Sequence, residues 1–371
     1  MAEQKKILIF TYMLNNYGAV LQSYALQSYL KKQGCNDVRV VNFETKRHQQ
    51  LNKIYKKRSS NFFIQLVFMI LTTLKFSKLN RRKKRTALFK KKFMCFTQKF
   101  QSQEQLFTHL PDADIFISGS DQVFNPNGLN KDVYYLDFPK GYGKKIAYAP
   151  SFGSFKGIDK VSQDIKRLLM DFDALSCREN EGSDYMSKLL SRPVLTVADP
   201  TLLLSKNEWK EISNTPKFDG NYILIYDLNG GESLICIAKK IQKRTGLKII
   251  CITDKVQKRY NVDKQIYDAG PSEFVGLIEM ASYVVTDSFH GTMFSLIFNI
   301  PFYTYIAVPS SSSRILNILK RLNLLDRVID FGKEETWNGF DESIRNYNKE
   351  MNSFLLESKD FINKNICSYE Q

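Results

Sequence analysis

The sequence lacks the short motifs that mark many metal and nucleotide sites. No H-E-x-x-H, Walker A or G-x-G-x-x-G pattern occurs in its 371 residues. Histidine is rare, with three in the chain, and the six cysteines form no C-x-x-C pair. Neither a zinc ribbon nor a redox motif is therefore expected, and we predict no metal and no cofactor. Unpatterned cysteines and the absence of a secretory apolar stretch are typical of a reduced, cytoplasmic protein.

Acidic residues are absent between residues 45 and 103, where seventeen Lys and Arg occur. The whole chain carries a net charge of +16, and without this segment the charge is about −1. The segment also contains an apolar run, residues 61–74, which is shorter than the roughly 20 residues that span a bilayer. We expect the segment to hold the protein on an anionic membrane surface, with a solvated basic helix pair packed on the core as the alternative. Nucleic acid is not expected, because no nucleic-acid fold signature accompanies the charge.

Apolar runs typical of strands alternate with helical patterns along the rest of the chain. "KKILIFTY", "AVLQSYALQSYLKKQG" and "DVRVVNF" predict a strand, a helix and a strand, which is a βαβ unit of a parallel sheet. "YILIYDL", "LICIAKKIQKRTG" and "LKIICITD" begin a second such set. We therefore predict an α/β protein with Rossmann-like domains over 1–205, including the basic segment 45–103, and over 220–335. A C-terminal helix is predicted within 340–371, from 341 to 365.

A histidine loop lies between two of these predicted elements. His290 follows a strand that ends at Thr286 and Asp287, and it precedes a helix that begins near Thr292. Free backbone N–H groups and the helix dipole attract anions at such a position, and Gly291 would let the backbone approach a ligand closely. The alternative is a capping loop in which Asp287 or Ser288 caps the helix and His290 merely packs.

Three further polar loops follow predicted strands. "NNYGAV" contains Asn16 and Gly18, "SGSDQVFNP" contains Ser120 and Asp121, and "SCREN" contains Arg178. Each has an ordinary interpretation as a turn, a helix cap or a surface ion pair. Because ligands of parallel sheets bind outside the carboxyl ends of the strands, the loops together favour a site for a phosphorylated or carboxylated substrate over a metal site.

Several long motifs make the chain resemble the polysaccharide pyruvyl transferase family. "NNYGAVLQSYALQSYL", "ISGSDQVFNP", "AYAPSFG", "LSCRENEG", "VADPTLLL" and "VVTDSFHGTMFSLIFNIPF" occur in the family's order, from about residue 5 to 327, excluding the basic segment. The resemblance implies a glycosyltransferase-B-like fold of two Rossmann-type domains facing a cleft. It also implies transfer of a pyruvyl group from phosphoenolpyruvate to a sugar of a cell-surface polysaccharide, such as an exopolysaccharide or capsule, forming a pyruvate ketal.

The resemblance also assigns roles to residues. His290 matches the family's catalytic histidine, Arg178 its phosphoenolpyruvate-binding arginine, and Arg314 a further basic residue. Asp121 or Asp287 would orient the imidazole or take a proton from the sugar hydroxyl. The remaining predicted substrate contacts come from the loops described above: Asn16, Gly18, Ser120, Ser288, Gly291 and Thr292. Better characterised members have an arginine where this chain has Ser288.

That departure leaves two other functions open. One is a nucleotide-sugar glycosyltransferase of the same fold, and the other is a membrane-bound accessory subunit of a polysaccharide assembly complex. For the pyruvyl transferase, the natural acceptor is a lipid-linked oligosaccharide. The protein would then act as a peripheral protein at the inner face of the cell membrane.

Overall fold

The structure, a computed structural model, describes residues 5–13, 16–55, 59–138, 143–153, 158, 162–214, 221–229, 231–255, 258, 260–307, 312–339 and 346–367. The chain divides into two compact units. The first consists of Met1–Gln49, Lys90–Leu204 and Asn348–Gln371, and the second of Gln50–Phe89 and Ser205–Tyr347. The chain therefore passes from one unit to the other more than once.

A parallel sheet forms the centre of the first unit. Its order among the described residues is β3-β2-β1-β4-β5-β6-β7. The strands are β1 (Lys6–Phe10), β2 (Asp37–Phe43), β3 (Phe96–Phe100), β4 (Ile115–Ser118), β5 (Lys144–Ala147), β6 (Ala174–Cys177) and β7 (Leu195–Thr196). Sequential strands run outward from β1 in one direction and from β4 in the other, so the order reverses between β1 and β4.

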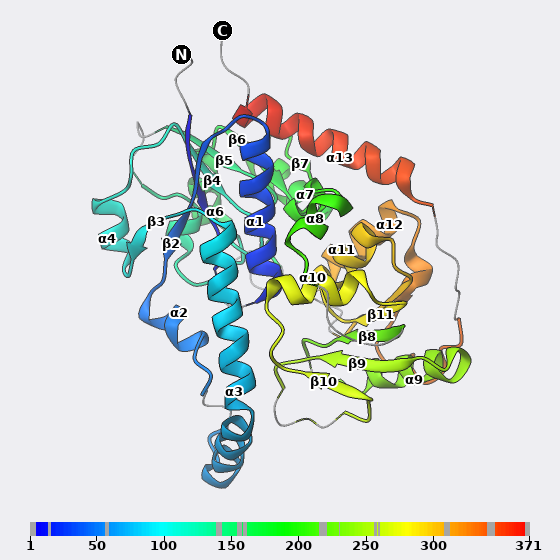
Figure 1. Cartoon of the computed structure of the whole chain (residues 1–371). Helices are drawn as coiled ribbons and strands as arrows, with labels where there is room; N and C mark the ends of the chain where they lie inside the picture. The colour runs from blue at the N-terminus through cyan, green and yellow to red at the C-terminus, as the bar shows by residue number, and fades with distance from the viewer. Residues whose placement is uncertain are drawn as a thin grey trace. The chain divides into compact units, whose positions relative to one another are not determined.

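Helices connect these strands, as βαβ crossovers require. They are α1 (Tyr17–Lys32), α2 (Lys46–Leu51), α4 (Gln103–Thr108), α5 (Lys131–Tyr134), α6 (Ser162–Met170) and α7 (Asn180–Leu190). A further helix of this unit, α13 (Asn348–Ile362), follows the last strand that the structure describes (Figure 1). One hydrophobic core joins Leu8 and Phe10 of β1 to Leu168 of α6. The C-terminal helix packs on this unit too, since Ser358 of α13 accepts the Ala198 N–H at 2.8 Å.

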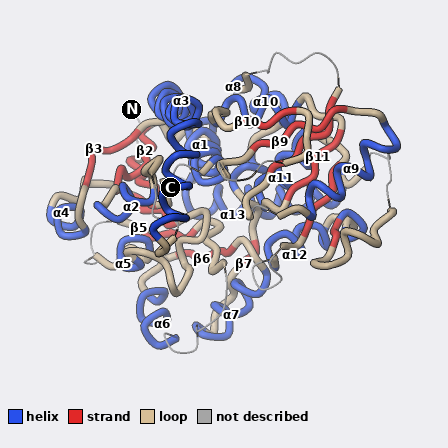
Figure 2. The backbone as a smooth tube through the Cα atoms, turned by 90° about the horizontal axis from the view of Figure 1, so that it is seen from below, coloured by secondary structure: helices blue, strands red, loops and turns tan. Residues whose placement is uncertain are grey.

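The second unit repeats the same strand order. Its sheet, as far as the structure describes it, runs β10-β9-β8-β11-β12-β13, all parallel, and reverses between β8 and β11. The strands are β8 (Tyr222–Tyr226), β9 (Lys248–Ile252), β10 (Lys264–Ile266), β11 (Tyr283–Thr286), β12 (Phe302–Tyr305) and β13 (Val328–Ile329). The helices are α8 (Lys206–Ile212), α9 (Ser233–Thr245), α10 (Pro271–Glu279), α11 (Phe289–Phe298) and α12 (Ser313–Arg321) (Figure 2).

Both faces of the second sheet are buried, which explains its continuous apolar strands. Ile223 and Ile225 of β8 share a core with five apolar side chains of α9. Tyr226 points to the opposite face, because side chains alternate along a strand, and its ring lies 4.8 Å from Phe274 of α10. Phe274 in turn contacts Phe294 of α11 at 5.7 Å. The sheet thus holds α11, and the histidine loop before it, in a fixed position.

The predicted α/β class with two Rossmann-type units of the glycosyltransferase-B kind is confirmed, because both sheets are parallel and have the doubly wound strand order. Two helix ends show ordinary capping. Glu273 accepts the Gly270 N–H at the start of α10 at 2.9 Å, and Gly246 ends α9 in the left-handed conformation. The predicted C-terminal helix begins later than expected, at Asn348, and residues 341–345 lie outside the described part of the chain.

The sequence predicted the basic segment 45–103 as one insert of the first domain, and the structure differs. It contains α2, the 32-residue helix α3 (Phe62–Phe93) and the edge strand β3. The strand β3 pairs with β2 and so belongs to the first sheet. Residues 50–89 instead group with the second unit, where Arg85 of α3 forms an ion pair with Glu273 at 3.3 Å. The segment is therefore divided between the two units.

Candidate functional site

Both predicted catalytic loops lie where a strand order reverses. Asp121 follows β4 in the first sheet, and His290 follows β11 in the second. The carboxyl end of a parallel sheet at such a switch point is the place where doubly wound folds bind ligands, because the adjacent loops diverge there. Each unit therefore presents one predicted acid–base residue at its own switch point.

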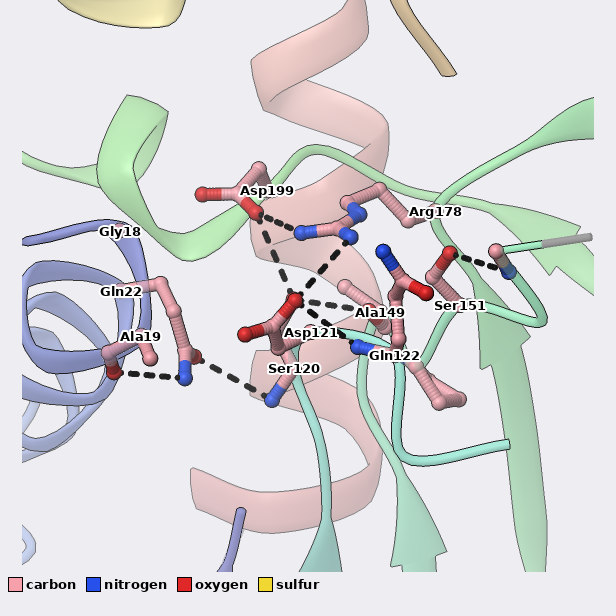
Figure 3. Close-up of polar contacts among 12 residues, drawn as sticks. Gly18, Ala19, Gln22, Ser120, Asp121, Gln122, Ala149, Ser151, Arg178 and Asp199 are labelled. Atoms are coloured by element: carbon pink, nitrogen blue, oxygen red, sulfur yellow. Dashed lines mark hydrogen bonds and ion pairs between the residues drawn. The ribbon is translucent and has the colours of Figure 1, made fainter. Parts of the chain in front are cut away.

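In the first unit, a buried arginine is held by carboxylates. Arg178, directly after β6, has its Nη1 2.7 Å from Asp199 Oδ2 and its Nη2 3.7 Å from Asp121 Oδ1 (Figure 3). The side chain of Arg178 is 2% exposed and that of Asp199 0%. Burial opposes the charge, but Asp199, Asp121 and Glu179 outweigh it and raise the pKa of the Arg178 guanidinium. Arg178 thus remains a cation inside the unit.

The sequence prediction gave Arg178 direct contact with the substrate. In the structure, its guanidinium faces two carboxylates and is closed to solvent, so an anionic donor could reach it only by displacing one of them. The arrangement fits a positioning role better: Arg178 holds the carboxylate of Asp121, whose side chain is 19% exposed. Direct binding of the donor by Arg178 remains a prediction.

Asp121 is held in an unusual backbone conformation. Its φ is +71°, in the left-handed region that non-glycine residues seldom adopt and that is enriched at functional sites. Its carbonyl accepts the Ser151 N–H at 2.8 Å, and its Oδ1 accepts the Gln122 N–H at 2.9 Å. Main-chain and side-chain bonds thus fix the carboxylate at the edge of the sheet. Asp121 is well placed to accept a proton from a bound hydroxyl.

Three predicted substrate contacts of the first unit have structural roles. Ser120 is 0% exposed, its hydroxyl donates to the Ala149 carbonyl at 2.8 Å, and its N–H donates to Gln22. Its side chain therefore has a structural role in the loop after β4, and direct contact with substrate stays a prediction. Asn16 is the N-cap of α1 and accepts the Gly18 N–H at 2.9 Å, so this pair forms the ordinary cap.

In the second unit, His290 is the second residue of α11. Its ring lies 5.1 Å from the Phe289 ring, and the Arg314 guanidinium of α12 lies over the Phe289 ring, 5.8 Å from its centroid. Phe289 therefore links the predicted proton-transfer residue to the predicted basic residue. The helix N-terminus and the cation of Arg314 together create positive potential near His290. This grouping suits an anionic ligand.

Asp287 is hydrogen-bonded to the loop that follows β8. Its Oδ1 accepts the Leu228 N–H at 2.9 Å, and its Oδ2 accepts the N–H and the side-chain amide of Asn229 at 3.0 and 2.7 Å. Burial raises the pKa of Asp287, and these hydrogen bonds act in the opposite direction. The carboxylate joins the loops that follow β8 and β11. Its proposed part in proton transfer remains a prediction.

The other predicted ligands around His290 support the helix end. Ser288 caps α11 by accepting the Gly291 N–H at 3.3 Å. Thr292 is 0% exposed and its hydroxyl bonds to the Ser288 carbonyl and to Thr304. Contact of Thr292 with substrate stays a prediction. Gly291 lets α11 approach its own strand, since an added Cβ would lie 2.5 Å from Thr286 Oγ1.

Replacing Gly291 by alanine is expected to destabilise the second unit by about 1–3 kcal/mol, the usual cost of overpacking. The Thr286 hydroxyl cannot turn aside freely, because it donates to the Tyr226 carbonyl and accepts the Ser288 N–H. Urea unfolding measures the change. Gly231→Ala is the matched control, since its Cβ would meet only the Ser233 nitrogen at 3.8 Å. Equal stability of the two variants would contradict the packing argument.

Two buried acids of the first unit were missed by the sequence prediction. Asp199 caps the short 3-10 helix Pro200–Leu203 and accepts both the N–H and the hydroxyl of Thr201. Glu179 is 1% exposed and accepts the Phe152 N–H at 2.7 Å. The motif "VADPTLLL" was the available signal for Asp199, because an aspartate before proline is a typical helix cap.

Among the described residues, no group of three or more His, Cys, Asp or Glu could hold a metal ion.

Comparisons with known proteins place the chain in a family. Two solved structures resemble this chain in fold at low sequence identity. One is a putative UDP-N-acetylglucosamine 2-epimerase from Listeria monocytogenes, with 9% identity, coverage of all of both chains and a TM-score of 0.49. The other is the UDP-GlcNAc 2-epimerase from Neisseria meningitidis bound to UDP-GlcNAc, with 12% identity, coverage of 99% of this chain and 94% of that chain, and a TM-score of 0.46. No curated protein matches the chain significantly. The sequence profile described as polysaccharide pyruvyl transferase matches residues 16–309, and the chain belongs to this family.

Proposed function

We propose that the protein transfers a pyruvyl group from phosphoenolpyruvate to a sugar of a cell-surface polysaccharide precursor, forming a pyruvate ketal. Family membership supports a transferase of this kind. The observation that carries the proposal is the grouping of His290, Phe289 and Arg314 at the N-terminus of α11. It combines a group that can donate a proton with a cation and a helix dipole that suit an anionic donor.

The donor has two anionic groups, a carboxylate and a phosphate. The planar guanidinium of Arg314 matches either through paired hydrogen bonds. The Phe289 ring orients that guanidinium and also packs against His290, so binding of the donor would bring its carbon atoms near the imidazole. The N-cap Ser288, at the position where better characterised members have an arginine, adds no charge. Arg314 is thus the residue that we assign to donor binding in the second unit.

The chemistry balances with these groups. His290 gives a proton to the methylene carbon of the enol phosphate, while a sugar hydroxyl adds to the neighbouring carbon and its proton passes to a carboxylate. Phosphate then leaves with the electrons of its C–O bond and takes the proton from the carboxylate, while a second sugar hydroxyl adds to the same carbon and gives its proton to His290. The products are a cyclic ketal and inorganic phosphate. General acid–base catalysis of this kind contributes about 10²–10⁴-fold.

We place this reaction at the cytoplasmic face of the membrane, with a lipid-linked oligosaccharide as the acceptor. The support is the basic and apolar segment within 45–103, which would bring the protein to the surface where such acceptors lie. A soluble oligosaccharide with the same sugar would test the chemistry apart from the location.

Ligand-dependent stability tests the donor. Phosphoenolpyruvate at about 100 times its dissociation constant should stabilise the protein by about 2.7 kcal/mol, because it binds only the folded state. Thermal unfolding with phosphoenolpyruvate, UDP-GlcNAc or inorganic phosphate measures this effect. Stabilisation by the nucleotide sugar and not by phosphoenolpyruvate would contradict the proposal and support a nucleotide-sugar glycosyltransferase. Release of phosphate together with the ketal, seen by mass spectrometry, would complete the test.

A further inference from the structure

The N-terminal part of α3, residues 62–76, exposes apolar side chains over most of its circumference, whereas the stripe of Gln65, Phe68, Thr72 and Lys75 is half-buried or buried. Successive helical residues are rotated by roughly 100°, so three neighbours in a row already point in widely different directions. Thr72 is the one residue of this stretch that the structure shows as buried. Nine large apolar side chains are between 40% and 75% exposed: Phe62, Phe63, Ile64, Leu66, Val67, Met69, Ile70, Leu74 and Phe76. We call residues 62–76 the apolar tip.

The following part of α3 attaches the helix to its own unit. Arg81 forms an ion pair with Asp268 at 3.0 Å, and Arg85 donates to the Asp268 carbonyl at 2.8 Å and pairs with Glu273. Lys75 lies over the Tyr267 ring at 5.0 Å. In Figure 1 the first turns of α3 extend away from the sheet that contains β8, β9 and β10. The tip is thus held by its C-terminal end.

Tyr55, which precedes the apolar tip in the sequence, lies beside residues at the C-terminal end of the tip. The Tyr55 ring stacks on the Phe76 ring at 5.9 Å, and its hydroxyl lies 3.2 Å from Thr73 Oγ1. By length and composition alone, α3 could cross a membrane. A crossing would put Tyr55 and Phe76 on opposite sides of the bilayer, however, and the structure puts them side by side. The tip therefore fits insertion from one side.

Cations follow the tip directly, and no acid lies between residues 45 and 103. Lys78, Lys83 and Lys84 are exposed on the helix after Phe76. The tip is about 21 Å long, at 1.5 Å per residue, and is shorter than a hydrocarbon core of about 30 Å. An inserted tip would place these lysines at the depth of the lipid phosphates. Their charge complements an anionic surface.

We propose that the apolar tip of α3 inserts from one side into an anionic phospholipid bilayer, and that the cations after it bind the headgroups. A partner helix would cover one stripe of the tip, whereas side chains exposed over most of its circumference suit a medium that surrounds them. A helix that lies in the interface would need a broad polar face, and Thr73 is the one polar residue among the exposed residues of the tip. The sequence predicted a surface contact, and the structure adds insertion from one side. The inference is independent of the proposed reaction, because no site residue lies on α3.

Binding of the full chain to vesicles tests the proposal. The probes are vesicles of phosphatidylglycerol and phosphatidylcholine in equal parts, and vesicles of phosphatidylcholine alone. We expect sedimentation with the anionic vesicles and at least about tenfold weaker binding for the triple variant Phe62→Ser, Phe63→Ser, Ile70→Ser, which loses buried apolar area. Leu356→Ser on α13 removes an equally exposed leucine outside the tip and should bind normally.

A depth measurement separates insertion from adsorption. In Phe63→Trp, we expect a blue shift of the added tryptophan emission and quenching by lipids brominated on the acyl chains, with Trp209 and Trp337 of the parent protein as the background. The triple variant should keep its thermal stability, because the replaced side chains are exposed. The proposal is overturned by absence of vesicle binding, by equal binding of the triple variant, or by a tryptophan that acyl bromine does not quench. Dimers that form without lipid and depend on the tip would identify a second copy of the chain as the partner. Resistance to alkaline carbonate extraction would show that α3 spans the membrane.

Discussion

Replacing His290 by alanine is expected to lower turnover by about 10²–10⁴-fold, the range for loss of a general acid or base. The imidazole lies at the N-terminus of α11 beside the Phe289 ring, and the cationic Arg314 guanidinium lies over that same ring. Ketal formation requires a proton at the methylene carbon of the donor, and no other histidine lies in the second unit. Single-turnover release of phosphate from phosphoenolpyruvate measures the effect directly.

Two further variants distinguish the loss of proton transfer from the loss of side-chain packing. His290→Gln keeps a polar side chain of similar length but cannot transfer a proton, so its turnover should fall as far as that of the alanine variant. His109→Ala is the matched control, because His109 is exposed at the end of α4. Both His290 variants should bind phosphoenolpyruvate with little change. Near-normal turnover in either of them would remove His290 from the mechanism.

Much of the fold could be predicted because local patterns determine it. The run "KILIF" and its counterpart "YILIY" are buried on both faces, and continuous apolar strands of this length are typical of parallel sheets. A right-handed crossover then places each helix, and strand order follows from repeated βαβ units. The position of Asp121 and His290 after strands was therefore available from sequence. The strand at the end of the basic segment could not be predicted, because "FTQKF" has a polar, cationic pattern and forms an edge strand.

The partners of each side chain could not be predicted. Ser120 and Thr292 look like loop ligands in sequence, but backbone geometry at the strand and helix ends turns both into the core. Arg178 pairs with Asp199, 21 residues away, through strands that meet only in the folded sheet. Its nearest acid in sequence, Glu179, bonds instead to the Phe152 N–H. Charge type is visible in a sequence, whereas the choice among several possible partners depends on tertiary packing.

Replacing Asp199 by asparagine is expected to destabilise the first unit by about 3–5 kcal/mol, because it leaves Arg178 charged and buried with one carboxylate fewer. The raised pKa of Arg178 means that deprotonation gives no relief. Arg178→Lys should also destabilise the unit, since an ammonium cannot reproduce the planar fork. Urea unfolding measures both. Asp137→Asn is the control, because Asp137 forms a doubly hydrogen-bonded pair with an exposed arginine, Arg167, and its loss should change little.

A double variant separates the structural role of this pair from its role at the site. Replacing Arg178 by methionine and Asp199 by leucine removes both buried charges, and well-packed apolar substitutes for a buried ion pair are often neutral for stability. We expect this variant to be more stable than Asp199→Asn alone. It should nevertheless remain poorly active, because Asp121 loses the guanidinium 3.7 Å from its carboxylate. Full activity in the stable double variant would show that Arg178 serves the fold alone. If Asp199→Asn were as stable as the parent, the buried pair would not contribute to the fold, and Arg178 would be free to exchange Asp199 for the anionic donor.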